Sequence, residues 1–118
     1  MILLEEIKIS VIDQDTIAEI NFKLVGSKRV NDDRYKSCLS SYYYYEKDEE
    51  QIASIVLSLI KGHYFINGNK RTAYAVLTIL SCFNEITIKK SDEQIANIMI
   101  DIAEHDYTVP TVANMIFN

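Results

Sequence analysis

Residues 63–73 bring together side chains that could carry out phosphate chemistry. His63 is one of only two histidines in the chain, and a neutral imidazole can take a proton from a hydroxyl near pH 7. Lys70 and Arg71 add a point charge and a planar fork, both suited to phosphate oxygens. The stretch lies between two apolar runs of helical periodicity, so it would lead into a helix N-terminus, where unpaired backbone N–H groups bind anions.

Three neighbours support this interpretation. Gly68 has no Cβ and lets backbone approach a ligand, Asn69 offers amide donors to a developing negative charge, and Phe65 would anchor the loop by burying its ring. Each residue type also has an ordinary structural role, since Gly-Asn is common in turns and a Lys-Arg pair is often merely solvated. Their coincidence between two helices favours a functional site.

The stretch resembles the signature of the Fic/Doc superfamily, which reads His-x-Phe-x-Asp/Glu-Gly/Ala-Asn-Gly/Lys-Arg. The matching residues, in order, are His63, Phe65, Asn67, Gly68, Asn69, Lys70 and Arg71. The continuation into Thr72 and Ala73 and the short chain are most similar to the death-on-curing (Doc) toxin branch. Longer Fic enzymes continue to a second arginine, where this chain has Tyr74.

The resemblance implies a toxin of a toxin–antitoxin system that acts as a transferase. In it, His63 would be the catalytic base toward a protein hydroxyl, and residues 68–71 would hold the phosphates of ATP or another nucleoside triphosphate. Death-on-curing toxins phosphorylate a translation elongation factor, whereas longer Fic enzymes transfer a nucleotide monophosphate. Lys70 in place of glycine, and Tyr74 in place of arginine, favour phosphate transfer onto such a target.

One position departs from the family pattern. Asn67 stands where the family usually has a carboxylate that binds Mg²⁺, and a neutral amide oxygen is a weaker ligand for that ion. The alternative function is therefore a catalytically weakened module that binds nucleotide or a partner without turnover.

Two partner sites also follow from the resemblance. The basic loop containing Ser27, Lys28 and Arg29 corresponds to the flap that docks the target chain. The family's inhibitory motif, Ser/Thr-x-x-x-Glu-Gly/Asn, is not intact in the chain, because the nearest match from Ser81 to Glu85 is followed by isoleucine. Inhibition would then come from a separate antitoxin protein.

Composition indicates a single domain of 118 residues, long enough to bury a core without disulfides or metals. Glycine and proline are scarce, at three and one, which favours an all-α bundle of about six helices with short connections. A net charge of −5 argues against general nucleic-acid binding. No apolar run is long enough for a membrane span and the first residues lack a basic signal start, so a cytoplasmic protein is expected.

Apolar spacing and capping residues predict the helices. The first is expected to begin after the N-cap Asp13 and to turn Ile17, Ile20 and Leu24 inward, preceded over residues 7–11 by either a short strand or an extended arm. Further helices are predicted from about residues 31 to 39, from 48 to a stop at Gly62, from the motif to Phe83, from 91 to about 102, and from 109 onward.

Two remaining features concern single side chains. Four consecutive tyrosines at positions 42–45 cannot all face a core, so one or two are expected at the surface, as a helix end or as a partner-binding face. Cys38 and Cys82 fall on apolar faces of separate predicted helices, where they would be small buried hydrophobes without a disulfide.

Overall fold

A computed structural model describes residues 11–26 and 34–118 of the chain. Within these ranges it contains five α-helices, two short 3-10 helices and no β-strand. The elements are α1 (Gln14–Val25), η2 (Arg34–Ser37), η3 (Tyr42–Tyr44), α2 (Asp48–Lys61), α3 (Asn69–Phe83), α4 (Asp92–Glu104) and α5 (Val109–Phe117). The predicted all-α bundle is confirmed. Residues 7–10 of the predicted arm and the flap residues Ser27, Lys28 and Arg29 lie outside the described residues.

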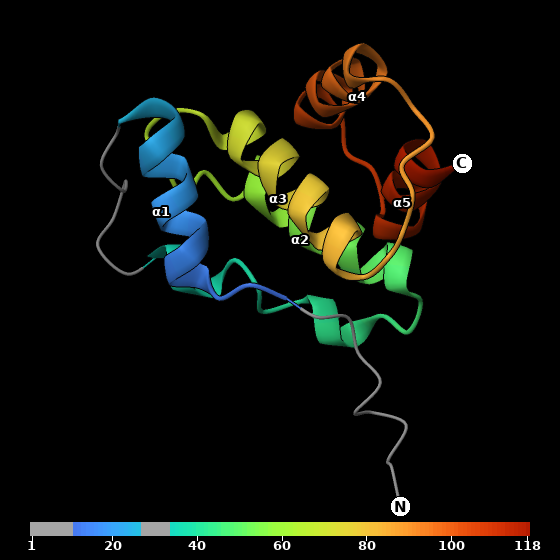
Figure 1. Ribbon diagram of the computed structural model, residues 1–118, viewed down its shortest axis with the longest axis horizontal. Coiled ribbons are helices and arrows are strands. Elements are labelled where there is room, and N and C mark those ends of the chain that lie inside the picture. Colours follow the sequence, from blue (N-terminus) through green and yellow to red (C-terminus); the bar gives the residue numbers. More distant parts are fainter. Residues whose placement is uncertain (1–10, 27–33) are drawn as a thin grey trace, which may run out of the picture.

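Helices α2 and α3 form the centre of the bundle, and the motif loop joins them (Figure 1). Helix α1 packs against α3, α5 packs against α2, and α4 contacts both central helices. The side chains of α2 and α3 that face these neighbours are fully buried, among them Ile52, Ile55, Leu59, Val76, Leu77 and Leu80. Both ends of the motif loop are therefore attached to the most deeply buried helices of the fold.

Two predicted helix starts, those of α1 and α4, are confirmed by their caps. Asp13 accepts a hydrogen bond from the backbone N–H of Thr16 at 2.8 Å, and this bond holds the pKa of its carboxyl below the usual value. Ser91 and Gln94 form a reciprocal capping box at the start of α4. These caps are local interactions, which is why the sequence alone predicts them.

Three predicted inward side chains instead lie at the surface. Leu24 is 42% exposed and Phe83 is 59% exposed, and Cys82 is exposed in the last turn of α3. Leu24 and Phe83 lie close to the ends of their helices, where the neighbouring helices no longer cover them. Only Cys38 matches the predicted buried thiol, and burial raises its pKa to about 11.

The tyrosine run is split between core and surface, as predicted. Tyr42 is buried, and this burial, together with its hydrogen bond to Tyr43, raises its pKa to about 12. Tyr43 and Tyr44 are 63% and 82% exposed. Tyr42–Tyr44 form the short 3-10 helix η3, which precedes α2 in the chain.

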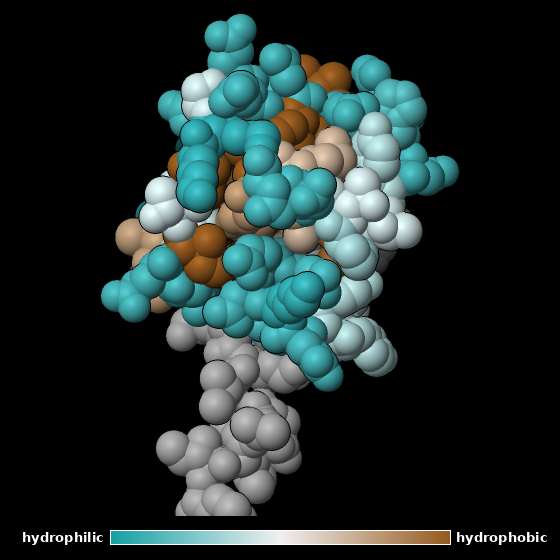
Figure 2. Space-filling view, turned by 90° about the vertical axis from the view of Figure 1, so that its right-hand side faces the viewer, coloured by the Kyte–Doolittle hydropathy of each residue, from teal (hydrophilic) through white to brown (hydrophobic). Residues whose placement is uncertain are grey.

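The side of the molecule where α4 and α5 lie is mostly hydrophilic, with apolar side chains in small separate patches (Figure 2). Within the described part of the chain, no helix is both long enough and apolar enough to cross a membrane.

Candidate active site

The side chain of Asn69 joins the two ends of the motif loop by hydrogen bonds to the backbone of Phe65. Asn69 accepts a hydrogen bond from the Phe65 backbone N–H at 3.2 Å and donates one from its Nδ2 to the Phe65 carbonyl at 2.9 Å. The ring of Phe65 is 2% exposed and joins the core. Asn69, which the sequence indicates as a donor to phosphate, therefore uses both ends of its amide to hold the loop. Its backbone N–H and its second amide hydrogen are what it can offer to a ligand.

Helix α2 stops at Gly62, its C-cap, as predicted, and the left-handed residue is His63, one position later. Gly62 has φ −78°, whereas His63 has φ 51°. A Cβ on Gly62 would lie 2.3 Å from the ring of Tyr64 and 2.7 Å from the carbonyl of Ser58. The glycine is thus needed for space, and the left-handed turn falls on the histidine. This turn sets the direction of an exposed imidazole at the start of the loop.

Gly68 is required by the packing of α1 against the loop. It caps α3 with φ 75°, and a Cβ there would approach Cγ1 of Val25 to 2.6 Å. The sequence suggested that the missing Cβ makes room for a ligand, but the close neighbour is the end of α1. Helix α1 therefore lies directly against the start of α3 and helps to fix the loop.

Replacing Gly68 with alanine should destabilise the fold by about 2 kcal/mol, because the new Cβ adds left-handed strain and displaces Val25. Gly26→Ala is the matched control, since Gly26 has φ 65° but nothing lies within 4 Å of the position that a Cβ would take there. That variant should lose only about 1 kcal/mol, from strain alone. Urea unfolding of both variants, alone and with Val25→Ala, measures the difference. Equal losses for the two glycines would show that Val25 does not restrict this position.

The start of α3 supplies the donors for an anion. The first backbone bond of this turn runs from the Thr72 N–H to the Gly68 carbonyl at 2.8 Å, so helix geometry leaves the N–H groups of residues 69–71 without intrahelical partners. The positive end of the helix dipole lies at the same place. Lys70 and Arg71 are both exposed there. Backbone donors and two exposed cations thus lie in the same turn, an arrangement that suits phosphate groups.

A pocket of about 440 Å³ lies against this turn and collects most of the predicted site residues. The motif residues that line it are His63, Ile66, Asn67, Gly68, Asn69, Lys70 and Arg71. Tyr74, at the position of the second arginine, does not line it, and its hydroxyl donates instead to Asp92 at the start of α4. The pocket therefore brings an imidazole, two cations and a helix N-terminus together.

The sequence did not predict the other side of the pocket. Ile60 and Lys61, from the end of α2, and Ala103, from the end of α4, complete the lining. The Nζ of Lys61 donates to the Ala103 carbonyl at 3.2 Å, which ties the two helix ends together. Lys61 could have been suspected because it precedes His63 by two residues, but nothing local in the sequence indicates Ala103.

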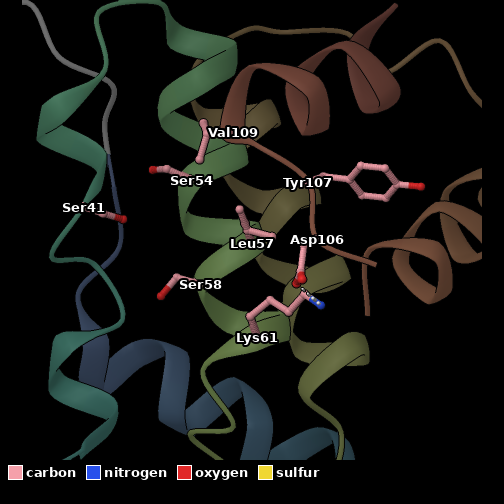
Figure 3. A pocket seen from close by; sticks show the side chains of 8 residues that line it. All are labelled: Ser41, Ser54, Leu57, Ser58, Lys61, Asp106, Tyr107 and Val109. Atoms are coloured by element: carbon pink, nitrogen blue, oxygen red, sulfur yellow. Dashed lines mark ion pairs between the residues drawn. The ribbon is translucent and has the colours of Figure 1, made fainter. Parts of the chain in front are cut away.

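A second hollow, of about 350 Å³, lies beside α2 and the segment that joins α4 to α5 (Figure 3). Ser54, Ser58 and Lys61 contribute to it from α2, and Lys61 forms an ion pair with Asp106 at 3.6 Å. Tyr107 points its ring away from this hollow. The hollow contains neither His63 nor any residue of the anion-binding turn, so the motif pocket is the candidate active site.

The donor set in the motif pocket is poor for a metal ion by itself. Asn67 supplies the single side-chain oxygen at the family's magnesium position, and it is exposed. Within residues 11–26 and 34–118, no group of three His, Cys, Asp or Glu side chains could hold a metal ion. Any Mg²⁺ would therefore depend mainly on oxygens that a nucleotide brings with it.

The model of the Fic/DOC family matches residues 11–81, which is more than half of the 118-residue chain and includes the whole motif loop. No curated protein matches the chain.

Proposed function

Because the chain belongs to the Fic/DOC family, whose members transfer nucleotide or phosphate groups onto proteins, we propose that it moves a phosphate-containing group from a nucleoside triphosphate to a protein hydroxyl. One observation carries the proposal. A single pocket of about 440 Å³ is lined by His63, Lys70 and Arg71 at the N-terminal turn of α3. These are the groups that such a transfer requires.

In the proposed step, a ring nitrogen of His63 takes the proton of the target hydroxyl. The hydroxyl oxygen then bonds to phosphorus while the bond from phosphorus to the leaving phosphate oxygen breaks. The leaving group is a nucleoside diphosphate if the γ-phosphate is attacked, or pyrophosphate if the α-phosphate is attacked. Lys70, Arg71 and the free N–H groups of α3 would stabilise the charge on the transferred group and the leaving group.

The transferred group is proposed to be the γ-phosphate. Tyr74 stands where the longer Fic enzymes have a second arginine, and its hydroxyl is bonded to Asp92 outside the pocket. The site therefore has its second cation at Lys70, beside Arg71, and none at position 74. This difference, together with Lys70 in place of glycine, supports phosphate transfer over nucleotide transfer.

Mg²⁺ would accompany the nucleotide in this proposal. Family members typically use a nucleoside triphosphate, often with Mg²⁺. Asn67 Oδ1 is the side-chain oxygen that would contact the ion, with nucleotide phosphates and water as the other ligands. Bound there, the ion would neutralise phosphate charge.

The presence of Asn67 at the magnesium position favours a second function, which is binding without group transfer. If one neutral oxygen is too weak a ligand, the chain would bind a nucleotide or a protein partner without transferring a group. The cations and helix N-terminus would still suit a phosphate, so binding would persist in the absence of turnover.

The proposed biological role is that of a cytoplasmic toxin that acts on a translation elongation factor. A separate antitoxin would inhibit it. Family members often pair with an antitoxin, and the intact inhibitory motif is missing from this sequence.

The deciding experiment uses ATP labelled either on the α- or on the γ-phosphate. Each is incubated with the protein, Mg²⁺ and a bacterial lysate, and label on protein is measured after electrophoresis. We expect transfer of the γ label and not of the α label. Transfer of the α label would indicate a nucleotide transferase. Tight ATP binding without transfer of either label would favour the binding function.

A further inference from the structure

One buried amide of α1 contacts the motif loop directly. Asn21 is 1% exposed, and its Nδ2 donates to the backbone carbonyl of Asn67 and to Oγ1 of Thr72, each at 2.9 Å. These two acceptors lie just before and just after the segment 68–71, which carries the anion donors. A residue far away in the sequence thus holds both ends of the phosphate-binding turn.

We propose that Asn21 is a positioning residue that aims the Gly68 N–H into the motif pocket. No peptide bond in the described ranges is cis, so the Asn67 carbonyl and the Gly68 N–H, which share one planar trans peptide, point in opposite directions. The carbonyl points toward Asn21 on α1. The Gly68 N–H therefore points away from α1.

The pocket lies on the side to which this N–H points. Among the described residues, none from α1 lines the pocket, whose walls come from the end of α2, the motif loop and Ala103 of α4. Helices α1 and α4 lie on opposite sides of α3 (Figure 1). The Gly68 N–H is thus added to the donors at the start of α3, extending the row that a phosphate would meet.

A glycine at this position explains why an external restraint is needed. Gly68 lacks a Cβ, so the peptide between residues 67 and 68 can rotate at little cost when nothing holds its carbonyl. The Asn21 hydrogen bond removes that freedom before a ligand arrives. Preorganised donors bind an anion more tightly because they need no further ordering at binding.

This inference rests on the phosphate-binding part of the proposed function, so its test uses binding and not transfer. The chain contains only three glycines, and their backbone amides fall in a separate region of a ¹⁵N–¹H NMR spectrum. ATP and inorganic phosphate are titrated separately into the parent protein. We expect the Gly68 amide to move markedly with both probes and the Gly26 amide to remain in place.

The decisive variant is Asn21→Leu, which has a similar volume but no donor. It should weaken ATP binding about tenfold or more, because the Gly68 N–H is no longer held in position to donate to a charged phosphate. The Gly68 amide of this variant should respond only weakly to ATP. Thr72→Val is the matched control, since it removes the other buried partner of Asn21 and keeps the bond to Asn67. It should lose stability but retain the affinity and the Gly68 shift. All proteins are compared at a temperature at which circular dichroism shows them folded.

The outcomes separate this inference from the proposed function. Equal ATP affinity and equal Gly68 shifts in the parent and in Asn21→Leu would overturn it, as would a parent Gly68 amide that ignores both probes. Asn21→Ala replaces the leucine variant if that variant does not fold. A parent that binds ATP through Gly68 but transfers no label would refute the transferase function and leave the role of Asn21 supported.

Discussion

Replacing His63 with alanine is expected to lower the rate of group transfer by about 10²–10⁴-fold, the usual contribution of a general base. The imidazole is exposed and begins the loop next to the anion-binding turn, so its loss removes a proton acceptor and little packing. The measurement is the transfer of label from ATP to a target protein. ATP affinity, measured on the same variant, should stay close to that of the parent.

The backbone of His63 needs its own control, because this residue has φ 51°. Asparagine adopts the left-handed region more easily than alanine does, and its side-chain amide cannot take up a proton near neutral pH. His63→Asn should therefore keep the loop geometry and lose the same activity. If either variant transfers label at the parent rate while remaining folded, His63 is not the base.

Replacing Asn67 with aspartate is expected to raise the transfer rate and to lower the Mg²⁺ concentration needed for half-maximal activity by about tenfold. The reason is that a charged oxygen of nearly the same shape is a much better ligand for this ion. The backbone bond from Asn21 to the residue 67 carbonyl does not involve the exchanged atoms, so the loop should keep its position. Transfer assays over a range of Mg²⁺ concentrations give both quantities.

An added negative charge could also act through the net charge of the protein. Asn97→Asp is the control for that effect, since Asn97 is exposed on α4 and does not line the pocket. It should leave the Mg²⁺ requirement unchanged. The contrary outcome is that neither the parent nor Asn67→Asp transfers label at saturating Mg²⁺ and ATP, with an elongation factor among the targets supplied. In that case the binding function replaces the transferase proposal.

The local sequence predicted the five α-helices and the residue types of the loop, but the described part of the helix predicted from about residue 31 to 39 forms only a short 3-10 helix, Arg34–Ser37. Caps such as Asp13 and the pair Ser91 and Gln94 act within four residues, so their side chains indicate where a helix begins. Apolar spacing identified the central helices because α2 and α3 are covered along most of their length. The motif is contiguous, and its residue types alone indicated a base, two cations and a helix N-terminus.

Local pattern was less reliable where neighbours decide the outcome. Periodicity placed Leu24 and Phe83 inward, but a helix face is buried only where another element covers it. The stop at Gly62 was predicted, but not that a Cβ there would collide with Tyr64 or that His63 would take the left-handed conformation. These features depend on contacts that a single helix does not reveal.

Only the tertiary structure showed what holds the site together. The sequence pattern did not single out Asn21, which is buried and donates to a backbone carbonyl 46 residues away. Lys61 and Ala103 complete the pocket from two helices that meet only after folding. A motif read from the sequence supplies the reacting groups, because their chemistry is local. Their orientation depends on hydrogen bonds and packing between distant segments, and the folded chain decides it.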